Sequence, residues 1–154
     1  MQDGRFVLVD NIDADLLMFT WTGNAQDYVT GTMFSRRTQL HVEIARRMGI
    51  TSGRKNQVDH ASRNKLDCRR ENLRASTPMQ NGANSGLDAR NKSGFKGVSR
   101  YRAGNCWQAS IRVEGKSRHL GHFEDPSEAA RAYDEAAKKA FGVFAHLNFP
   151  PQVS

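Results

Sequence analysis

The sequence predicts a protein of the α+β class, in which a small module of two strands and one helix precedes a three-stranded antiparallel sheet packed on one helix. Three observations lead to this prediction. The chain has 154 residues, enough for two small domains but too few for a single large enzyme fold. Residues 58–81 fit a hairpin followed by a helix, and residues 95–141 fit three strands followed by a longer helix.

A short strand, a helical turn and one longer helix are expected in the first third of the chain. Residues 5–9 have the composition of a short strand, and residues 13–19 fit a helical turn that leads to Trp21. The apolar spacing over residues 38–48 predicts a helix of about three turns, with Thr38 as its cap and Gly49 just past its end.

The second half is expected to form a meander and a helix. Strand-length runs occupy residues 95–102, 106–113 and 117–123, and the short segments between them, residues 103–105 and 114–116, suit tight turns. Asp125 and Pro126 then predict a helix start, and Gly142 its end. The apolar face of this helix consists of small or aromatic residues: Ala129, Ala130, Tyr133, Ala136, Ala137, Ala140 and Phe141.

A linker separates these two parts. Residues 82–94 hold three glycines and show no hydrophobic periodicity. We therefore expect a domain over residues 1–85, a linker over residues 86–93 and a second domain over residues 94–150.

Composition excludes several protein classes. Hydrophobic residues make up 38% of the chain, without a run of about 18 that could span a bilayer, and the N-terminal segment lacks the pattern of a secretory signal. Cys68 and Cys106 have no partner at Cys-x-x-Cys spacing, which argues against a zinc knuckle or a disulfide framework. We expect an intracellular protein with no membrane partner.

Basic residues are concentrated in the middle of the chain. The net charge is +7, and residues 36–119 carry 19 Lys or Arg against 6 acidic residues. Phe95, Tyr101 and Trp107 are interleaved with these charges. A nucleic acid is the partner that this pattern favours, with a solvated basic face as the alternative.

Residues 58–81 contain the candidates for chemistry. Thr77, Pro78 and Gln80 fit a helix start, which would bring Asn81 beside Asp59 if that helix packs across the predicted hairpin. A carboxylate and an amide oxygen suit a hard divalent cation, with Mg²⁺ expected and Mn²⁺ as the alternative. The adjacent His60 is suited to take a proton from an attacking water. Nearby basic side chains would hold backbone phosphates: Arg63, Lys65, Arg69, Arg70 and Arg74.

This segment resembles the HNH family of ββα-metal nucleases, particularly its homing endonuclease branch. The matching pattern is Asp59-His60, an Asn 12 residues after that His (Asn72), and a further Asn 9 residues on (Asn81). The resemblance implies that Asp59 and Asn81 ligate the metal, that His60 is the general base and that Asn72 braces the hairpin loop.

Some positions depart from the pattern or have accessory roles. His41 resembles a His in the helix that often precedes the motif, and a satisfied helix histidine is the alternative. Together with Arg74 it is an accessory candidate. Asp67, Cys68 and Val42 differ from residues common in relatives, but they lie outside the catalytic set.

Residues 94–150 resemble the APETALA2-type DNA-binding domain of plant ethylene-response factors, which places a three-stranded sheet in the major groove. Strand alternation alone predicts that Ala109, Ile111 and Val113 face the helix, so that Gln108, Ser110 and Arg112 face outward. The full set expected to bind DNA comprises Lys96, Ser99, Arg100, Tyr101, Arg102, Gln108, Ser110, Arg112, Ser117, Arg118 and His119.

These expectations combine into a metal-dependent DNA endonuclease of phage or mobile-element homing type. It would act on double-stranded DNA, without a small-molecule substrate, in the cytoplasm of a bacterial host if a phage encodes it. A DNA-binding regulator with an inactive HNH segment is one alternative, and a structural or RNA-associated binding protein is another.

Overall fold

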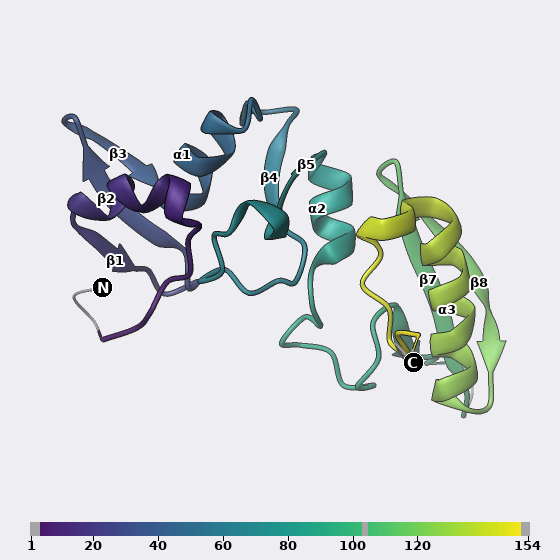
Figure 1. Cartoon of the computed structure of the whole chain (residues 1–154). Helices are drawn as coiled ribbons and strands as arrows, with labels where there is room; N and C mark the ends of the chain where they lie inside the picture. Colours follow the sequence, from purple (N-terminus) through teal and green to yellow (C-terminus); the bar gives the residue numbers. More distant parts are fainter. Residues whose placement is uncertain (1–3, 103–104, 152–154) are drawn as a thin grey trace. The chain divides into compact units, whose positions relative to one another are not determined.

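The computed structural model describes residues 4–102 and 105–151. The chain divides into two compact units, Met1–Asn81 and Gly82–Ser154, and the division falls inside helix α2 (Pro78–Asn84). Both units combine helices with antiparallel strands, which confirms the predicted α+β class (Figure 1).

A three-stranded sheet that the sequence did not predict begins the first unit. Its strands are β1 (Trp21–Gly23), β2 (Val29–Met33) and β3 (Arg36–Gln39), paired antiparallel in that order. The 3₁₀ helix η1 (Asn11–Met18) precedes it, as expected for the helical turn before Trp21. The strands are only three to five residues long and contain few apolar residues, so neither length nor alternation marks them in the sequence.

The strand predicted over residues 5–9 is wrong. Only Leu8 forms a bridge there, parallel to Asp67, with hydrogen bonds of 2.8 Å from its N–H to the carbonyl of Leu66 and from the N–H of Cys68 to its carbonyl. The segment is held by one residue rather than by a ladder, so it packs beside the later loop without becoming a strand.

The predicted helix at residues 38–48 is present but shorter. Helix α1 spans Leu40–Arg47, because Thr38 and Gln39 complete strand β3. The Thr38 hydroxyl donates to the buried Glu43 carboxylate at 2.6 Å instead of capping a backbone N–H. Gly49 follows the helix with φ of 79°, the left-handed conformation that glycine adopts most readily.

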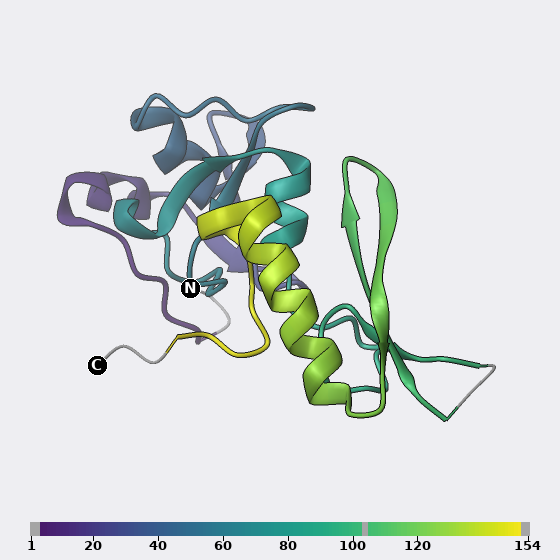
Figure 2. The ribbon, with the colours of Figure 1, turned by 90° about the vertical axis from the view of Figure 1, so that its right-hand side faces the viewer.

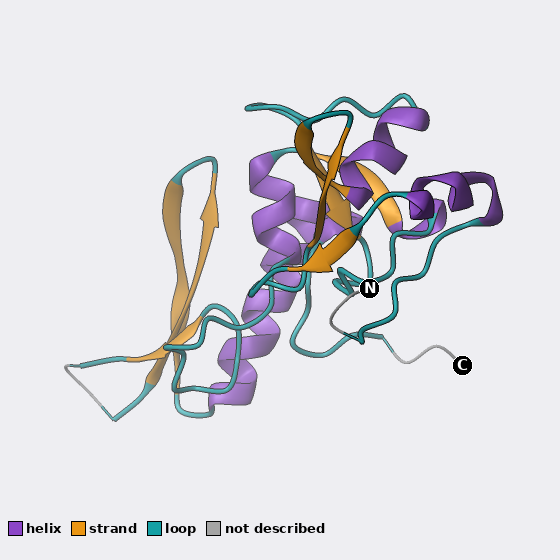
Figure 3. Ribbon diagram, turned by 90° about the vertical axis from the view of Figure 1, so that its left-hand side faces the viewer, coloured by secondary structure: helices purple, strands orange, loops and turns teal. Residues whose placement is uncertain are grey.

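The rest of the first unit is a hairpin and a helix. Strands β4 (Gln57–His60) and β5 (Leu73–Ser76) pair antiparallel, with the short helix η2 (Arg70–Asn72) just before β5 and α2 after it (Figure 1). Figure 3 distinguishes the helices, in purple, from the strands, in orange. This is the predicted arrangement of two strands and one helix. Its core also draws on the N-terminal sheet and α1: Leu16, Trp21, Val29, Leu40 and Ile44 are buried with Val58 and Leu73.

The second unit is a sheet packed on one helix. Strands β6 (Val98–Arg100), β7 (Trp107–Val113) and β8 (Lys116–Phe123) pair antiparallel in chain order, and α3 (Pro126–Phe141) lies along one side of them (Figure 2). Helix η3 (Gly142–Phe144) follows. Ala129, Ala130, Tyr133, Ala137 and Phe141 are buried as predicted, whereas Ala140 is exposed.

Close approach of sheet and helix depends on Gly97. A Cβ at this position would lie 1.9 Å from Cδ2 of Tyr133, and φ is 75°. Any larger residue there would push the helix off the sheet.

Residues of the expected linker are ordered within the second unit. Ala83 is buried in its core, and the Asn91 side chain accepts from the N–H groups of Ser93 and Gly94 at 2.9 and 3.0 Å. The unit therefore starts earlier than residue 94, where it was expected to begin. The turn expected at residues 103–105 includes positions 103 and 104, which lie outside the described residues.

Candidate functional site

The β4–β5 hairpin carries Asp59 and His60 at the end of its first strand. In the antiparallel register Asp59 faces Arg74 and His60 faces Leu73. Both Asp59 and His60 are 4% exposed. The Nε and Nη2 atoms of Arg74 lie 2.9 and 2.8 Å from Oδ2 of Asp59. Asp59 is thus paired with a cation from the neighbouring strand, which fixes the orientation of its side chain.

Asn72 holds the loop that joins the two strands. Its Oδ1 accepts from the N–H of Ser62 at 2.8 Å, and its Nδ2 donates to the carbonyl of Asp67 at 2.7 Å. Its own carbonyl accepts from the N–H of Ala61 at 2.8 Å. Because these bonds cross the loop directly after His60, they fix the backbone that carries the imidazole.

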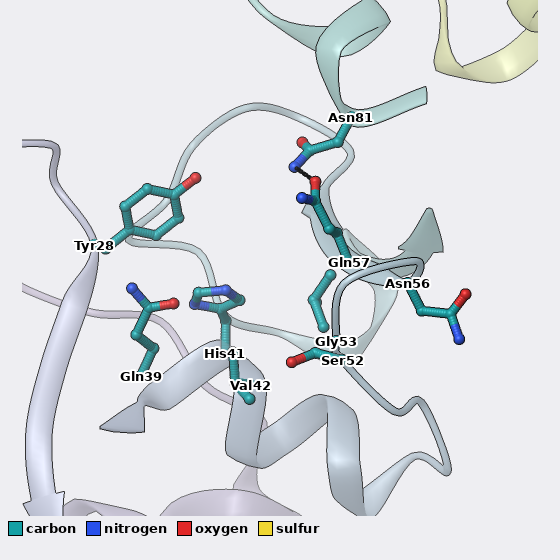
Figure 4. A pocket seen from close by; sticks show the side chains of 10 residues that line it. Tyr28, Gln39, His41, Val42, Ser52, Gly53, Asn56, Gln57 and Asn81 are labelled. Atoms are coloured by element: carbon teal, nitrogen blue, oxygen red, sulfur yellow. Dashed lines mark hydrogen bonds between the residues drawn. The ribbon is translucent and has the colours of Figure 1, made fainter. Parts of the chain in front are cut away.

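Helix α2 brings Asn81 against strand β4. Its start is the predicted capping box: the Thr77 N–H donates to the Gln80 side chain at 2.8 Å, and the Gln80 N–H donates to the Thr77 hydroxyl at 3.2 Å. Nδ2 of Asn81 donates to Oε1 of Gln57 at 2.7 Å (Figure 4). Gln57 and Asp59 are two residues apart on one strand, so their side chains leave the same face. Asn81 therefore lies on the Asp59 face of the hairpin.

Three aromatic rings from three separate segments meet beside this hairpin. The ring centroids of His41 and His60 are 4.7 Å apart, and the Tyr28 ring lies 5.4 Å from His41 and 6.1 Å from His60. The ammonium group of Lys65 sits 4.3 Å from the Tyr28 ring centroid. The His41 of α1, an accessory candidate from the sequence, is thus in contact with the predicted general base.

Burial keeps both imidazoles neutral. Burial lowers the pKa of His41 to about 3, and the neighbouring His60 contributes a smaller part of this decrease. Burial lowers the pKa of His60 to about 4, although the Asp59 carboxylate acts in the opposite direction. At neutral pH His60 therefore has a lone pair that can accept a proton.

Most of the basic side chains that were expected to hold phosphates form ion pairs with carboxylates. Arg69 bonds Asp67 at 2.9 and 2.8 Å, and Arg70 bonds the fully buried Asp13 at 2.7 and 3.0 Å. Arg70 thereby ties η1 to the hairpin, so its role in the fold is structural. The Lys65 ammonium instead donates to the carbonyl of Gln26 at 2.8 Å, and neither Lys65 nor Arg63 has a carboxylate partner among residues 4–102 and 105–151.

The outer face of the second unit's sheet carries most of the positions predicted to bind DNA. Ala109 and Ile111 are buried against α3, while Arg112, Ser117 and His119 are exposed on the outer face. Arg118 is also exposed, but it pairs with Ile111 and therefore lies on the α3 side of the sheet. Ser99 and Gln108 are joined across neighbouring strands by a hydrogen bond of 3.0 Å.

Lys96 is placed differently from the other positions. Its ammonium group donates to the carbonyls of Ala83 and Ser85 at 2.5 and 2.6 Å, at the C-terminal end of α2. It satisfies helix-end acceptors, whereas the sequence predicts a DNA contact.

A β-bulge adds His122 to this face. Ser110 pairs with His119 but Ala109 pairs with Gly121, so Leu120 is the extra residue. His119 and His122 consequently point to the same side, with ring centroids 4.5 Å apart, and the Tyr101 ring lies 4.3 Å from His122. Regular alternation would have placed the two histidines on opposite faces.

The segment that contains the hairpin is similar to a known protein family. Residues 52–83 match the HNH endonuclease family. This HNH segment contains Asp59, His60, Asn72 and Asn81, and it confirms the resemblance seen in the sequence.

Relatives of two kinds are similar to the chain. An uncharacterized HNH endonuclease of Acanthamoeba polyphaga mimivirus is 34% identical over 91 residues, which are 59% of this chain and 46% of that protein. The dehydration-responsive element-binding protein 2A of Arabidopsis thaliana is 50% identical over 58 residues, or 36% of this chain and 17% of that protein. The AP2-like ethylene-responsive transcription factor TOE2 of the same plant is 41% identical over 73 residues, or 47% and 15%.

The plant proteins match a stretch separate from the HNH segment. The chain spans less than half the length of each of these relatives. No solved structure matches it. None of the helices in the described part of the chain is long and apolar enough to cross a membrane.

Sequence reasoning missed three residues around the HNH segment and on the sheet face. Tyr28 comes from the unpredicted N-terminal sheet, Gln57 is the residue that Asn81 contacts, and His122 depends on the bulge. Tyr28 and His122 had no local signal, because a packing contact and a bulge bring them into place. The Gln57 contact follows from the predicted hairpin and helix once their register is known.

Proposed function

We propose that this chain is a divalent-metal-dependent DNA endonuclease, in which the HNH segment hydrolyses phosphodiester bonds and the sheet of the second unit recognises double-stranded DNA. The family match over residues 52–83, with Asp59, His60, Asn72 and Asn81 at the expected spacing, carries this proposal. The homing type and a phage or mobile-element origin are part of this proposal, and the mimivirus relative supports a viral origin only.

The side chains present fit a hard cation. Asp59 offers a carboxylate, and the bond from Nδ2 of Asn81 to Gln57 leaves the Asn81 amide oxygen as a ligand on the same face of β4. No cluster of three or more His, Cys, Asp or Glu side chains suited to a metal occurs in the described ranges. Two protein oxygens suit Mg²⁺, which keeps several waters and takes phosphate oxygens as further ligands, and Mn²⁺ is the alternative.

Each of these residues has a separate role in the proposed hydrolysis. Bound at Asp59 and Asn81, the cation would neutralise negative charge on the leaving oxygen. His60 takes the proton of the attacking water, and the arriving phosphate, an anion, raises the basicity of this imidazole. Asn72 keeps the loop after His60 in place, and Arg63 and Lys65 hold the flanking phosphates.

A plasmid cleavage assay tests the proposal. We expect nicked or linear product with Mg²⁺ and none with a chelator. His60→Ala is expected to reduce the rate about 100 to 10,000-fold, because a positioned proton acceptor is lost. Asp59→Asn is expected to abolish cleavage, whereas Asp88→Asn, which alters an exposed Asp–Arg pair, is the matched control.

The outcomes separate this function from its alternatives. DNA binding without cleavage under all metal conditions would identify a DNA-binding regulator with an inactive HNH segment. Preferential binding of RNA would point to an RNA-associated protein. Sequencing the cleaved ends would distinguish nicking from double-strand cleavage and give the position of the cut.

A further inference from the structure

A pocket of about 380 Å³ opens beside the HNH hairpin within the first unit. Its wall includes Tyr28, Gln39, His41, Gly53, Gln57 and Asn81 (Figure 4). A volume of this size is in the range of small-molecule sites. Asn81 belongs both to this wall and to the metal ligands proposed above.

The chemistry of the wall favours a neutral, planar and polar ligand. None of the ten residues that line the pocket is Lys, Arg, Asp or Glu, although the chain as a whole is strongly basic. Four of the ten carry side-chain amides, each of which offers a hydrogen-bond donor and an acceptor. A phosphate would require cations in the wall, whereas amides match the edges of nucleobases.

His41 supplies an independent sign that the pocket takes a ligand. The residue is 4% exposed, and its Nδ1 has no hydrogen-bond partner among residues 4–102 and 105–151. Buried polar atoms without partners are uncommon in proteins, because each loses its hydration without compensation. Nδ1 itself is inaccessible, so a ligand in the pocket that His41 lines would become its partner only when the ring turns toward that pocket.

Aromatic and amide groups meet at this point. The Tyr28 and His41 rings are 5.4 Å apart, and Nε2 of Gln57 is directed into the pocket while its Oε1 accepts from Asn81 (Figure 4). Flipped bases are read in this way, by stacking on aromatic side chains and by hydrogen bonds to their edges.

We propose that this pocket binds one unstacked nucleobase of the DNA, from the nucleotide next to the phosphate that is cleaved. The inference rests on the proposed function for its macromolecular substrate. The shared Asn81 places the base beside the scissile phosphate, because adjacent nucleotides occupy adjacent subsites. The enzyme would then unstack a base at the position where it cleaves the strand.

Two substitutions change the pocket without touching the proposed catalytic residues. A Cβ at Gly53 would have no atom within 4 Å, and its φ lies outside the left-handed region, so Gly53→Phe adds a bulky side chain at the pocket wall without backbone strain. Gly53→Ala is its matched control. Gln39→Leu removes one amide, and because the Gln39 side chain makes no capping bond to α1, the helix start is preserved.

The first measurement needs no cleavage. Each of the four deoxynucleosides is added alone to the full-length protein, and saturation-transfer NMR records which ligand protons contact it. We expect stronger transfer to base protons than to sugar protons, several-fold weaker with Gly53→Phe and Gln39→Leu, and unchanged with Gly53→Ala. Thermal melting of each variant verifies folding. Absence of transfer with every nucleoside, or equal transfer with folded Gly53→Phe, would overturn the proposal.

The second measurement uses duplex DNA centred on the mapped cut. A mismatch at the flanking nucleotide lowers the cost of unstacking its base. We expect it to tighten binding several-fold for the wild type and for Gly53→Ala, but not for Gly53→Phe. Equal tightening with Gly53→Phe would remove the pocket from base recognition. If the chain cleaves no DNA, the proposed function fails, and the nucleoside measurement still decides whether the pocket binds bases.

Discussion

Asp59 and Arg74 face each other across the β4–β5 hairpin, and the guanidinium makes two bonds, of 2.9 and 2.8 Å, to one oxygen of the carboxylate. The same carboxylate is a proposed metal ligand. A cation at Asp59 would lie close to the positive charge of Arg74, so the two compete for one negative group. The strength of the ion pair would therefore influence how tightly the proposed site holds a metal.

We predict that Arg74→Gln raises the affinity of the protein for Mn²⁺ several-fold, because removal of a neighbouring positive charge favours a cation at the carboxylate. Calorimetric titration of the metal-free protein measures this. Arg90→Gln, which breaks the exposed Asp88–Arg90 pair, is the control and is expected to leave the affinity unchanged. Equal affinities for Arg74→Gln and the wild type would show that the ion is held elsewhere.

The amide group of Asn72, and not only the size of its side chain, is predicted to stabilise the first unit. Asn72→Asp retains the acceptor for the Ser62 N–H but places a carboxylate oxygen against the Asp67 carbonyl. We expect a loss of about 1–3 kcal/mol in the free energy of unfolding for Asn72→Ala and a larger loss for Asn72→Asp. Urea unfolding followed by Trp21 emission in a Trp107→Phe background measures both.

The exposed Asn64 provides the control for this pair of variants. Its side-chain oxygen accepts from the Leu66 N–H at 3.1 Å, and a carboxylate can do the same. Asn64→Asp is therefore expected to change stability little. If Asn72→Asp were as stable as the wild type, the bond to the Asp67 carbonyl would have no energetic role.

Stability of the first unit is predicted to fall in mild acid because of His41. Its pKa of about 3 in the fold is below the ordinary value of 6.5, so the unfolded chain takes up a proton that the folded chain excludes. The contribution of the neutral His41 to the free energy of unfolding is complete above pH 6.5 and is lost as the pH falls toward 3. His41→Leu is expected to make the slope between pH 6 and 4 (about 1.4 kcal/mol per pH unit for each proton) shallower.

Urea unfolding at several pH values, again followed by Trp21 emission, checks this slope. His119→Leu, at an exposed position of the second unit, is the control and should leave the Trp21 transition unchanged. Parallel curves for His41→Leu and the wild type would mean that the His41 imidazole does not resist protonation in the fold.

Arg112 is predicted to read a base rather than a phosphate. It lies exposed in the middle strand of the sheet, where a bidentate contact to a guanine edge is worth about 1–3 kcal/mol. A binding selection on randomised DNA should show a relaxed preference at one position for Arg112→Ala. Arg131→Ala, on the exposed side of α3, is the control. Uniformly weaker binding with an unchanged preferred motif would instead assign Arg112 to a phosphate.

Local hydrogen bonding and periodicity explain what the sequence could predict. The Thr77–Gln80 capping box, the cap of α3 by Asp125, and the inward alternation of Ala109 and Ile111 all depend on residues a few positions apart. The spacing of Asp59, Asn72 and Asn81 likewise predicted a hairpin and a helix with these residues at defined points. The roles assigned to them remain predictions.

The sequence by itself determined the α+β class, the hairpin and helix around His60, and the sheet and helix of the second half, because short-range patterns encode each of these. Only the tertiary structure decided that Tyr28 and His41 pack on His60, that Arg70 is bound to Asp13, and that the unit boundary falls inside α2. These contacts join segments far apart in the chain. They depend on how whole surfaces fit together, and no short stretch of sequence carries that information.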